Sequence, residues 1–458
     1  MTFYLEGTKT KKMKIERFYD INLAHASYAI LSHGKIALID PARNPQPYYE
    51  FAVANEAKIT TVIETHPHAD FVSSHLEIQK KTNATIYVSR LLGAEYEHKS
   101  FDDGDEIKLG ELTLKAINTP GHSPDSISVL LLNEEGKEVA LFTGDTLFIG
   151  DVGRPDLRES VGNLTAKRES LAKQMFDSIQ HKLADLKDDI LVYPAHGAGS
   201  LCGKNLSSEP FSTLGKERRE NWAFREQTQE EFVQTILQDQ PFVPKYFGFN
   251  VSLNKKGAPS FEIGFHGVER LEDVSKVKEG ELVVDVRKES EFKAGHLPDS
   301  INIMLTERGK FETWLGAIIA PTEKFYLLAA DESQLEDAIS RTAKIGYEEL
   351  ILGAVSLNGA NLPKTSVKLD VEKFRNDLDG YSIVDVRNEG ETKKGKIFKN
   401  AITIPLHNLR EKIYEIPTDK PVVVHCAAGF RSAAGSSILE NELKDLEVFD
   451  LGEAIKEF

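Results

Sequence analysis

The sequence predicts an α/β protein in three parts: a mixed β-sandwich with helices outside, followed by two α/β units with parallel sheets. Three observations lead to this fold class. A chain of 458 residues is too long for one hydrophobic core. Paired strands joined at glycine dominate the segment before residue 200. In the second half, strands alternate with helices and one stretch of sequence repeats.

The composition excludes several classes of partner. A net charge of −16 and a pI near 5.4 argue against nucleic acid, because an acidic surface repels the phosphate backbone. The first 20 residues hold lysines without an apolar stretch after them, and no later segment has the length of a membrane-spanning helix. Two cysteines, Cys202 and Cys426, are too few for a disulfide framework, which suits a reducing compartment. We expect a soluble cytoplasmic protein that binds neither nucleic acid nor membranes.

The elements of the first part follow from hairpins and amphipathic helices. Residues 27–40 ("SYAILSHGKIALID") and 127–145 ("ISVLLLNEEGKEVALFTGD") each predict two apolar strands that turn at a glycine. Helices are predicted within 168–186 and 228–239. The Pro- and Gly-bearing segment after the second helix predicts a boundary near Gly257.

The second half contains an internal repeat. "ELVVDVRKESEF" at 281–292 recurs as "YSIVDVRNEGET" at 381–392. Each copy predicts a strand that ends in Asp-Val-Arg, then a short helix, then another apolar strand, a pattern typical of a parallel sheet covered on both faces. The repeated Asp and Arg of each copy are predicted to form an ion pair that holds the strand end.

Three domains follow from these signals. The first spans residues 1–258, the second 262–360 and the third 364–458. A linker near Pro363 separates the two repeated units.

Polar residues follow apolar strands in the first domain. Each lies in a turn rich in Gly or Pro, where the backbone can approach an ion closely. "ETHPHADFVSSH" (64–75) contributes three of them, and Phe71 stands where a second histidine usually completes a two-metal pattern. A set of this size predicts a metal site. Its members are His66, His68, Asp70, His122, Asp145 and His196.

This ordered set resembles the metallo-β-lactamase superfamily over roughly residues 10–260, and "FIGDVGRPDL" (148–157) is similar to its persulfide dioxygenase branch. The resemblance implies an αββα sandwich. It also implies one Fe(II) per chain, bound by His66, His122 and Asp145. Two imidazoles and one carboxylate form the triad suited to non-haem Fe(II), with open positions for O2 and substrate sulfur.

Phe71 bears on the number of metals. In two-metal hydrolases of this superfamily the second ion needs a histidine at that position, so one complete ligand set remains here. His68, Asp70 and His196 are then expected to orient the ligands and to order bound water. A mononuclear zinc hydrolase is the alternative, because the sequence constrains the geometry of the site more than the metal.

The third domain carries a second kind of site. "VVVHCAAGFRSA" (422–433) runs an apolar strand into Cys426 and then into a helix, so the loop amides are predicted to curl around the sulfur and stabilise an anion. This loop is similar to the rhodanese active loop, and its six residues from Cys to Arg match sulfurtransferases rather than the related phosphatases. The resemblance implies that Cys426 carries the persulfide. The implied substrate-binding residues are Ala427, Ala428, Gly429, Phe430 and Arg431.

The second domain lacks the cysteine and the arginine of this loop. Ala330 stands where Cys426 stands in the third domain, and no arginine closes the loop. We expect an inactive rhodanese-like domain that serves as a spacer or interface.

Two further residues carry two interpretations each. Cys202, six residues after His196, either relays sulfur to the metal cleft or fills a small apolar core position. Arg154 either steers the acidic tail of the substrate or caps local backbone carbonyls.

The whole chain resembles the fused persulfide dioxygenase and rhodanese enzymes of bacterial sulfide detoxification. The implied reaction oxidises a low-molecular-weight thiol persulfide with O2 to sulfite, and sulfur from Cys426 then converts sulfite to thiosulfate. Fusion raises the effective concentration of the shared intermediate. Glutathione, coenzyme A, bacillithiol and cysteine are the candidate thiols, and the family suggests a homodimer or homotetramer. The alternatives are a zinc thioester hydrolase of glyoxalase II type with regulatory rhodanese domains, and a non-enzymatic sulfur-carrier scaffold.

Overall fold

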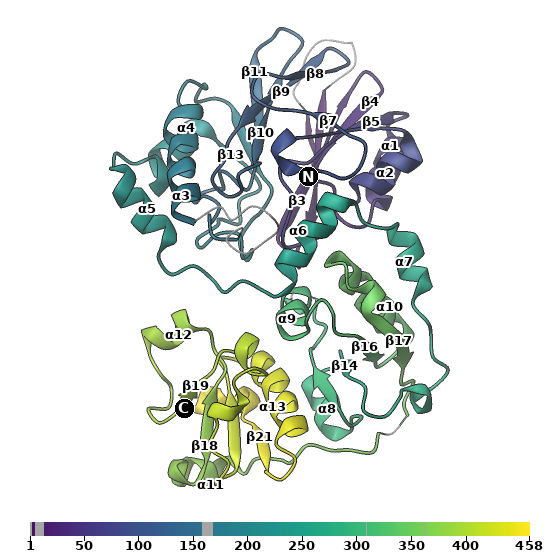
Figure 1. Ribbon diagram of the computed structural model, residues 1–458, viewed down its shortest axis with the longest axis vertical. Helices are drawn as coiled ribbons and strands as arrows, with labels where there is room; N and C mark the ends of the chain where they lie inside the picture. The colour runs from purple at the N-terminus through teal and green to yellow at the C-terminus, as the bar shows by residue number, and fades with distance from the viewer. Residues whose placement is uncertain (1, 5–12, 158–167, 308, 361) are drawn as a thin grey trace. The chain divides into compact units, whose positions relative to one another are not determined.

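The computed structural model describes residues 2–4, 13–157, 168–307, 309–360 and 362–458 (Figure 1). The chain divides into two units, the first made of residues 1–263 with 344–346 and the second of residues 264–343 with 347–458. Among the described residues, no helix combines the length and apolar character needed to cross a bilayer.

Two mixed sheets form the centre of the first unit. The first is seven-stranded in the order β1 to β7, and the second is six-stranded in the order β13-β12-β11-β10-β9-β8. The strands of the first sheet are β1 (Thr2–Tyr4), β2 (Lys14–Asp20), β3 (His25–Ser32), β4 (Lys35–Ile39), β5 (Lys58–Ile63), β6 (Thr85–Val88) and β7 (Lys99–Ser100). Those of the second are β8 (Glu106–Leu109), β9 (Leu112–Asn118), β10 (Ile127–Leu132), β11 (Glu138–Gly144), β12 (Leu191–Pro194) and β13 (Ser212–Thr213).

Both hairpins predicted in this unit are present. Strand β3 pairs with β4, and β10 pairs with β11, in each case antiparallel. The pairs β4 with β5, β5 with β6, and β11 with β12 are parallel, so both sheets are mixed.

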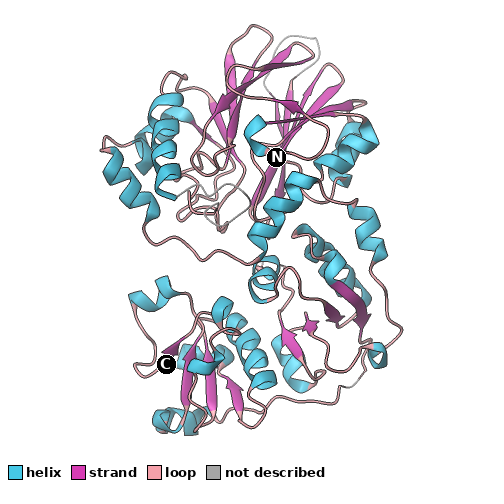
Figure 2. Cartoon of the chain, viewed as in Figure 1, coloured by secondary structure: helices cyan, strands magenta, loops and turns pink. Residues whose placement is uncertain are grey.

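Helices cover the outer faces of the two sheets, as Figure 2 shows. Helices α1 (Gln46–Ala54) and α2 (His75–Thr82) pack on the first sheet, and α3 (Arg168–Asp177), α4 (Leu214–Glu220) and α5 (Gln229–Leu237) pack on the second. The predicted helix at 168–186 continues beyond α3 as a short π-helical turn at Ser178–Lys182. Thr228 and Glu231 form a capping box at the start of α5.

Three hydrophobic clusters separate four layers. Along β3, Tyr28 and Ile30 face the second sheet whereas Ala29 packs toward the outer helices. The same alternation places Ile39 of β4 between the sheets and Leu38 under the helices. Side chains on a strand point to opposite faces in turn, so a strand buried on both sides is apolar throughout. The αββα sandwich expected from the sequence is confirmed.

The second unit contains two four-stranded parallel sheets with the same topology. Their orders are β15-β14-β16-β17 and β19-β18-β20-β21, and every pair in them is parallel. We call residues 269–357 the middle domain and residues 370–458 the last domain. The repeat found in the sequence therefore corresponds to a repeated α/β fold, which confirms the predicted parallel sheets.

The elements of the second unit alternate between strand and helix. The middle domain contains β14 (Val283–Asp285), α8 (Glu289–Ala294), β15 (Ser300–Asn302), α9 (Phe311–Ile318), β16 (Phe325–Ala329), α10 (Glu332–Lys344) and β17 (Ile351–Ser356). The last domain contains α11 (Val371–Asn376), β18 (Ser382–Asp385), α12 (Glu389–Lys394), β19 (Ile402–Thr403), β20 (Val422–His425), α13 (Phe430–Glu442) and β21 (Val448–Asp450).

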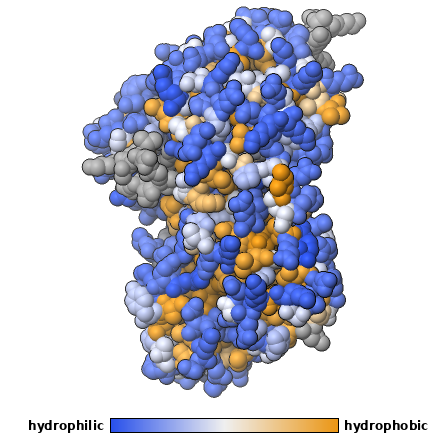
Figure 3. All heavy atoms as spheres, turned by 45° about the vertical axis from the view of Figure 1, so that its right-hand side comes forward, coloured by the Kyte–Doolittle hydropathy of each residue, from blue (hydrophilic) through white to orange (hydrophobic). Residues whose placement is uncertain are grey.

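Two helices lie near the first predicted boundary. Helix α6 (Tyr246–Lys256) ends at Gly257, whose φ of 82° suits glycine, and α7 (Phe261–Gly267) begins shortly after. The three predicted domain ranges stay predictions. Hydrophilic residues predominate on the face drawn in Figure 3, with apolar patches between them.

Candidate functional site

Three polar residues of the first unit converge at strand ends. Asp145 directly follows β11, His66 lies just after β5, and His122 follows β9. Their possible ligand atoms all lie within 4.8 Å of one another, and all three side chains are buried. The Nε2 atoms of His66 and His122 are 3.8 and 3.5 Å from Oδ2 of Asp145. The structure thus brings together the three ligands that the family resemblance implies.

Hydrogen bonds orient both imidazoles with Nε2 toward Asp145. Nδ1 of His122 donates to the carbonyl oxygen of Arg154 at 2.9 Å. Nδ1 of His66 lies 3.0 Å from Oγ1 of Thr65, which donates its own hydrogen to Asp40 at 2.8 Å. Burial lowers the pKa of both histidines, which favours neutral rings. A neutral ring that donates through Nδ1 keeps a lone pair on Nε2.

Asp145 offers the third donor. Its Oδ1 accepts a hydrogen bond from Nδ1 of His196 at 2.7 Å. Its Oδ2 is buried and makes no hydrogen bond within the described parts of the chain. A buried carboxylate oxygen left in this state is costly unless an ion is bound. Two imidazole nitrogens and this oxygen therefore fit one divalent transition metal.

Two glycines allow this close packing. A Cβ on Gly153 would overlap the carbonyl oxygen of Asp145 and lie 3.0 Å from Nδ1 of His122. A Cβ on Gly144 would lie 2.5 Å from Oγ1 of Thr65. Glycine is required at both places because any side chain would push apart the groups that orient the ligands.

His196, Asp70 and Cys202 form a second buried group behind Asp145. Nε2 of His196 lies 2.8 Å from Oδ2 of Asp70, and ligand atoms of all three residues lie within 4.8 Å of one another. Burial lowers the pKa of His196, but Asp145 and Asp70 outweigh it and raise that pKa well above its usual value. Burial raises the pKa of the Cys202 thiol well above its usual value. His196 and Asp70 therefore fix the orientation of Asp145, while Cys202 lies beside them as a thiol.

His68 lies beside His66, with 4.1 Å between ring centroids, and its Nε2 is near two other carboxylates. Its Nε2 is 3.1 Å from Oδ1 of Asp40 and 3.9 Å from Oε2 of Glu64. The ring of Phe71 packs against His68 at 4.4 Å and against His25 at 3.9 Å between centroids. Phe71 thus supplies an apolar wall where a two-metal site needs a nitrogen.

Arg154 contributes through its backbone. The side chain is buried and makes two hydrogen bonds of 2.6 Å to Asp156, and its Nη1 donates to the carbonyl oxygen of Leu201 at 3.3 Å. Two of these contacts are to a carboxylate and one is to a backbone carbonyl, so both interpretations of Arg154 stay predictions. The Arg154 carbonyl sets the tautomer of His122, a role that no side-chain pattern could reveal.

Asp40, Thr65 and Glu64 were missed by sequence reasoning. A signal existed for Asp40, because it directly follows an apolar strand, as Asp145 does. Its φ of 50° is unusual for a residue other than glycine and places its carboxylate against the backbone and hydroxyl of Thr65. Glu64 accepts a hydrogen bond from Ser73 at 2.6 Å.

The last domain presents Cys426 between β20 and α13. The side chain is buried, with 2% of its surface exposed. The backbone amide of Gly429 donates to its sulfur at 3.1 Å, and Oγ of Ser432 lies 3.7 Å away. Gly429 has a φ of 100°, which turns its amide back toward the sulfur as the helix begins. This arrangement stabilises a negatively charged sulfur at a helix N-terminus.

Arg431 lies on the first turn of α13. Its Nη2 donates to Oε1 of Glu391 at 2.8 Å, and its Nη1 donates to Oε2 of the same carboxylate. Ala427, Ala428 and Phe430 complete the loop without adding charge. Glu391 was not predicted from the sequence as part of this site.

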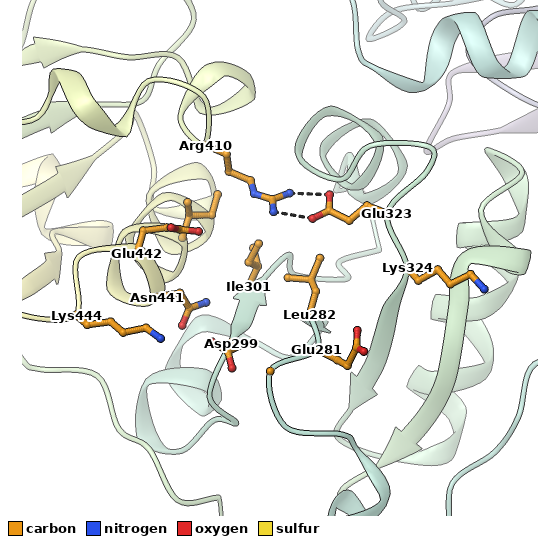
Figure 4. A pocket seen from close by; sticks show the side chains of 12 residues that line it. Glu281, Leu282, Asp299, Ile301, Glu323, Lys324, Arg410, Asn441, Glu442 and Lys444 are labelled. Atoms are coloured by element: carbon orange, nitrogen blue, oxygen red, sulfur yellow. Dashed lines mark hydrogen bonds and ion pairs between the residues drawn. The ribbon is translucent and has the colours of Figure 1, made fainter.

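The middle domain places Ala330 at the corresponding strand end. Ala330 lines a hollow of about 420 Å³ together with Arg287, Glu291 and Leu357. A larger groove of about 550 Å³ lies between the middle and last domains, where Arg410 forms hydrogen bonds of 2.8 and 2.6 Å to Glu323 (Figure 4). Among the described residues, neither hollow is lined by a cysteine or a histidine.

Two family models match the chain. The model described as the metallo-beta-lactamase superfamily matches residues 21–196. The model of the rhodanese-like domain matches residues 269–357 and again residues 370–458.

Several relatives are similar to the first unit. The chain is 31% identical over 174 residues to a cytoplasmic hydroxyacylglutathione hydrolase of Arabidopsis thaliana, covering 37% of this chain and 62% of the relative. It is 30% identical over 161 residues to the mitochondrial persulfide dioxygenase of Homo sapiens, covering 35% of this chain and 58% of the relative. The chain therefore spans less than two thirds of the length of these two relatives.

A solved structure is similar over a longer stretch. The structure, described as a metallo-beta-lactamase from Staphylococcus aureus subsp. aureus COL, is 35% identical with a TM-score of 0.68. The match covers 75% of this chain and 99% of the other, so the similarity extends beyond the sandwich alone.

Proposed function

Because the chain belongs to the metallo-beta-lactamase superfamily and contains two rhodanese-like domains, we propose that it couples persulfide oxidation to sulfur transfer. The first unit oxidises a low-molecular-weight thiol persulfide with O2 and water to sulfite and free thiol. The last domain then transfers sulfane sulfur from Cys426 to sulfite, which gives thiosulfate. The proposal includes one Fe(II) per chain and a cytoplasmic homodimer or homotetramer.

The donor set of His66, His122 and Asp145 carries the first half of the proposal. These three groups fit one metal ion, and the wall formed by Phe71 disfavours a second ion beside it. Fe(II) bound there would supply open coordination positions for O2 and for the persulfide sulfur. The persulfide dioxygenase relative supports this reaction class.

The protein's own groups hold this site in place. Thr65 and the Arg154 carbonyl keep Nε2 of each histidine free of a proton, and His196 holds one oxygen of Asp145. His196 lies between two carboxylates that raise its pKa, so it retains a proton on Nδ1 for Asp145. These contacts leave Oδ2 of Asp145 as the available oxygen.

Cys426 carries the second half of the proposal. Its thiolate attacks the outer sulfur of a second thiol persulfide, releases the free thiol and holds that sulfur as a cysteine persulfide, with the Gly429 amide hydrogen-bonded to the Cys426 sulfur. Attack by sulfite on the outer sulfur breaks the S–S bond, forms thiosulfate and returns the electron pair to the Cys426 thiolate. Charge and atoms balance, because a persulfide anion plus sulfite gives a thiolate plus thiosulfate.

Metal content and oxygen uptake test the first half. Protein purified without added metal is expected to contain about one iron and little zinc per chain, since one complete triad is present. His122→Ala should abolish O2 uptake with a thiol persulfide while sulfur transfer at Cys426 continues. His181→Ala is the matched control, because that histidine side chain is 69% exposed and lies outside the cluster. O2 uptake by His122→Ala at the wild-type rate would overturn the iron site.

A zinc-dependent thioester hydrolase of glyoxalase II type is the second candidate. The hydroxyacylglutathione hydrolase relative favours it. Two zinc ions per chain and hydrolysis of an acylglutathione without O2 uptake would establish this function in place of persulfide oxidation.

A further inference from the structure

The guanidinium of Arg431 forms a bidentate ion pair with a carboxylate. Both of its terminal nitrogens donate to the carboxylate of Glu391 from α12, with Nη2 to Oε1 at 2.8 Å. The Arg431 side chain is 15% exposed and that of Glu391 is 38% exposed, so the pair lies at the rim of the Cys426 loop. A bidentate pair of this kind neutralises the charge that an anionic ligand would otherwise meet.

Arg431 is the one charged side chain in the loop from Cys426 to Arg431. The hydrogen bond to Arg431 lowers the pKa of Glu391, so the carboxylate is ionised at neutral pH. A divalent anion that approaches Cys426 therefore meets a local charge near zero in place of a free cation. Coulomb attraction to Arg431 is correspondingly weakened.

The repeat shows which part of this arrangement is structural. Oε2 of Glu391 also accepts the backbone amide of Asn388 at 3.0 Å, which caps the start of α12. In the middle domain Glu291 caps α8 in the same way, with the amide of Lys288 at 3.2 Å. Leu335 stands there where Arg431 stands in the last domain. Capping explains the glutamate in both domains, whereas the contact with a loop arginine is present in the last domain alone.

We propose that Glu391 is a positioning residue that lowers the affinity of the Cys426 site for divalent sulfur oxyanions by holding Arg431. This inference rests on the proposed sulfur transfer at Cys426. The product thiosulfate then leaves readily, and thiosulfate is a poor donor in the reverse direction. In that direction a Cys426 thiolate and thiosulfate give the cysteine persulfide and sulfite, with charge and sulfur conserved.

Glu391→Gln tests the inference because glutamine keeps the oxygen that caps α12 and removes the charge. The KM for thiosulfate, measured by transfer of sulfur to cyanide, should fall about tenfold while kcat stays within about twofold, as expected when one like charge is removed near a dianion. The gain should shrink as salt is raised, because the pair lies at the surface.

Two control variants separate this contact from simpler causes. Glu291→Gln makes the same change, charge removed and capping oxygen kept, at the capping residue of the middle domain, where no loop arginine is present. Glu389→Gln removes a charge from α12 itself at an exposed residue that pairs with Lys393. Both should leave the KM for thiosulfate unchanged. An equal decrease in either control, or no decrease in Glu391→Gln, would overturn the role of Glu391.

A direct measurement of thiosulfate binding tests the inference without depending on turnover. Titration calorimetry with thiosulfate on Cys426→Ser and on Cys426→Ser with Glu391→Gln should show about tenfold tighter binding in the double variant. If the wild-type chain transfers no sulfur, the proposed function fails, and the two dissociation constants still decide whether Glu391 weakens oxyanion binding. Equal dissociation constants would overturn the inference even where transfer proceeds.

Discussion

Ala330 and Cys426 occupy the same position in two domains that share one strand order. Ala330 follows β16 and Cys426 follows β20, and a helix begins within a few residues of each. In the last domain the amide of Gly429 points at the cysteine sulfur. In the middle domain the carboxylate of Asp331 accepts the amide of Gln334, and the Gln334 side chain accepts the amide of Ala330.

The difference shows that a fold alone does not make an anion site. A helix N-terminus binds an anion only when its amides are left for the ligand. The carboxylate of Asp331 accepts one of these amides and adds a negative charge to the loop that corresponds to the Cys426 loop. The middle domain therefore has the same fold, but its own side chains accept backbone amide hydrogen bonds at the position of the anion site.

The largest effect is expected when the sulfur atom of Cys426 is removed, which tests the contrast between the two domains. Cys426→Ser should reduce sulfur transfer by at least about a hundredfold, because a hydroxyl cannot hold a persulfide. With a thiol persulfide and O2, the variant should still consume O2 and release sulfite in place of most thiosulfate. Chromatography of products within the first turnovers measures this, and Ala330→Ser is the matched control. An unchanged thiosulfate yield would mean that the first unit performs the whole reaction.

The second prediction concerns the strand-end ion pairs. Arg387 pairs with Asp385 at 2.7 Å, and Arg287 pairs with Asp285 at 2.6 Å. Burial raises the pKa of Asp385, but hydrogen bonds from Arg387 and the charge of His425 outweigh it, and the net pKa is lowered. At Asp285 burial dominates and the pKa is raised. Asp385→Asn should therefore destabilise its domain by about 3 kcal/mol at neutral pH, and Asp285→Asn by less.

The pH dependence of these two variants has opposite signs. The ionised Asp385 stabilises the folded state above the ordinary pKa of 3.8, and this contribution is lost as the pH falls through its lower folded value. The contribution of Asp285 is fully present below 3.8 and is lost as the pH rises through its raised folded value. Thermal unfolding of each variant against wild type between acidic and neutral pH measures both trends. Equal slopes for the two aspartates would contradict the assignment.

The smallest effect is expected for a variant that gives the middle domain the cysteine it lacks. Ala330→Cys, placed in the Cys426→Ser background, should leave sulfur transfer at the level of Cys426→Ser. The reason is that Asp331 keeps the loop amide and no arginine closes the loop. Measurement of thiocyanate formation from thiosulfate and cyanide is sufficient. Recovery of even a tenth of the wild-type rate would show that a thiol alone makes this fold active.

Local patterns determined much of the fold and of the chemistry. The apolar runs interrupted by glycine predict both hairpins of the first unit, and the Asp-Val-Arg repeat predicts two equivalent parallel sheets. Ligands placed shortly after strands, such as His66 after β5 and Asp145 after β11, are visible because polar residues that follow apolar strands stand out in the sequence. The cysteine loop is visible because its members are adjacent in the chain.

Pairings between distant segments were decided by the tertiary structure. The contact of Glu391 with Arg431 spans 40 residues, and the hydrogen bond from His122 to the Arg154 carbonyl spans 32. Spacing along the chain carries no information on such contacts, because they depend on strand register and on how layers pack. The direction of His68 toward Asp40 has the same origin. Residues adjacent in the sequence therefore indicated the metal ligands and the cysteine loop. Tertiary packing decided which groups orient the ligands and which carboxylate neutralises Arg431.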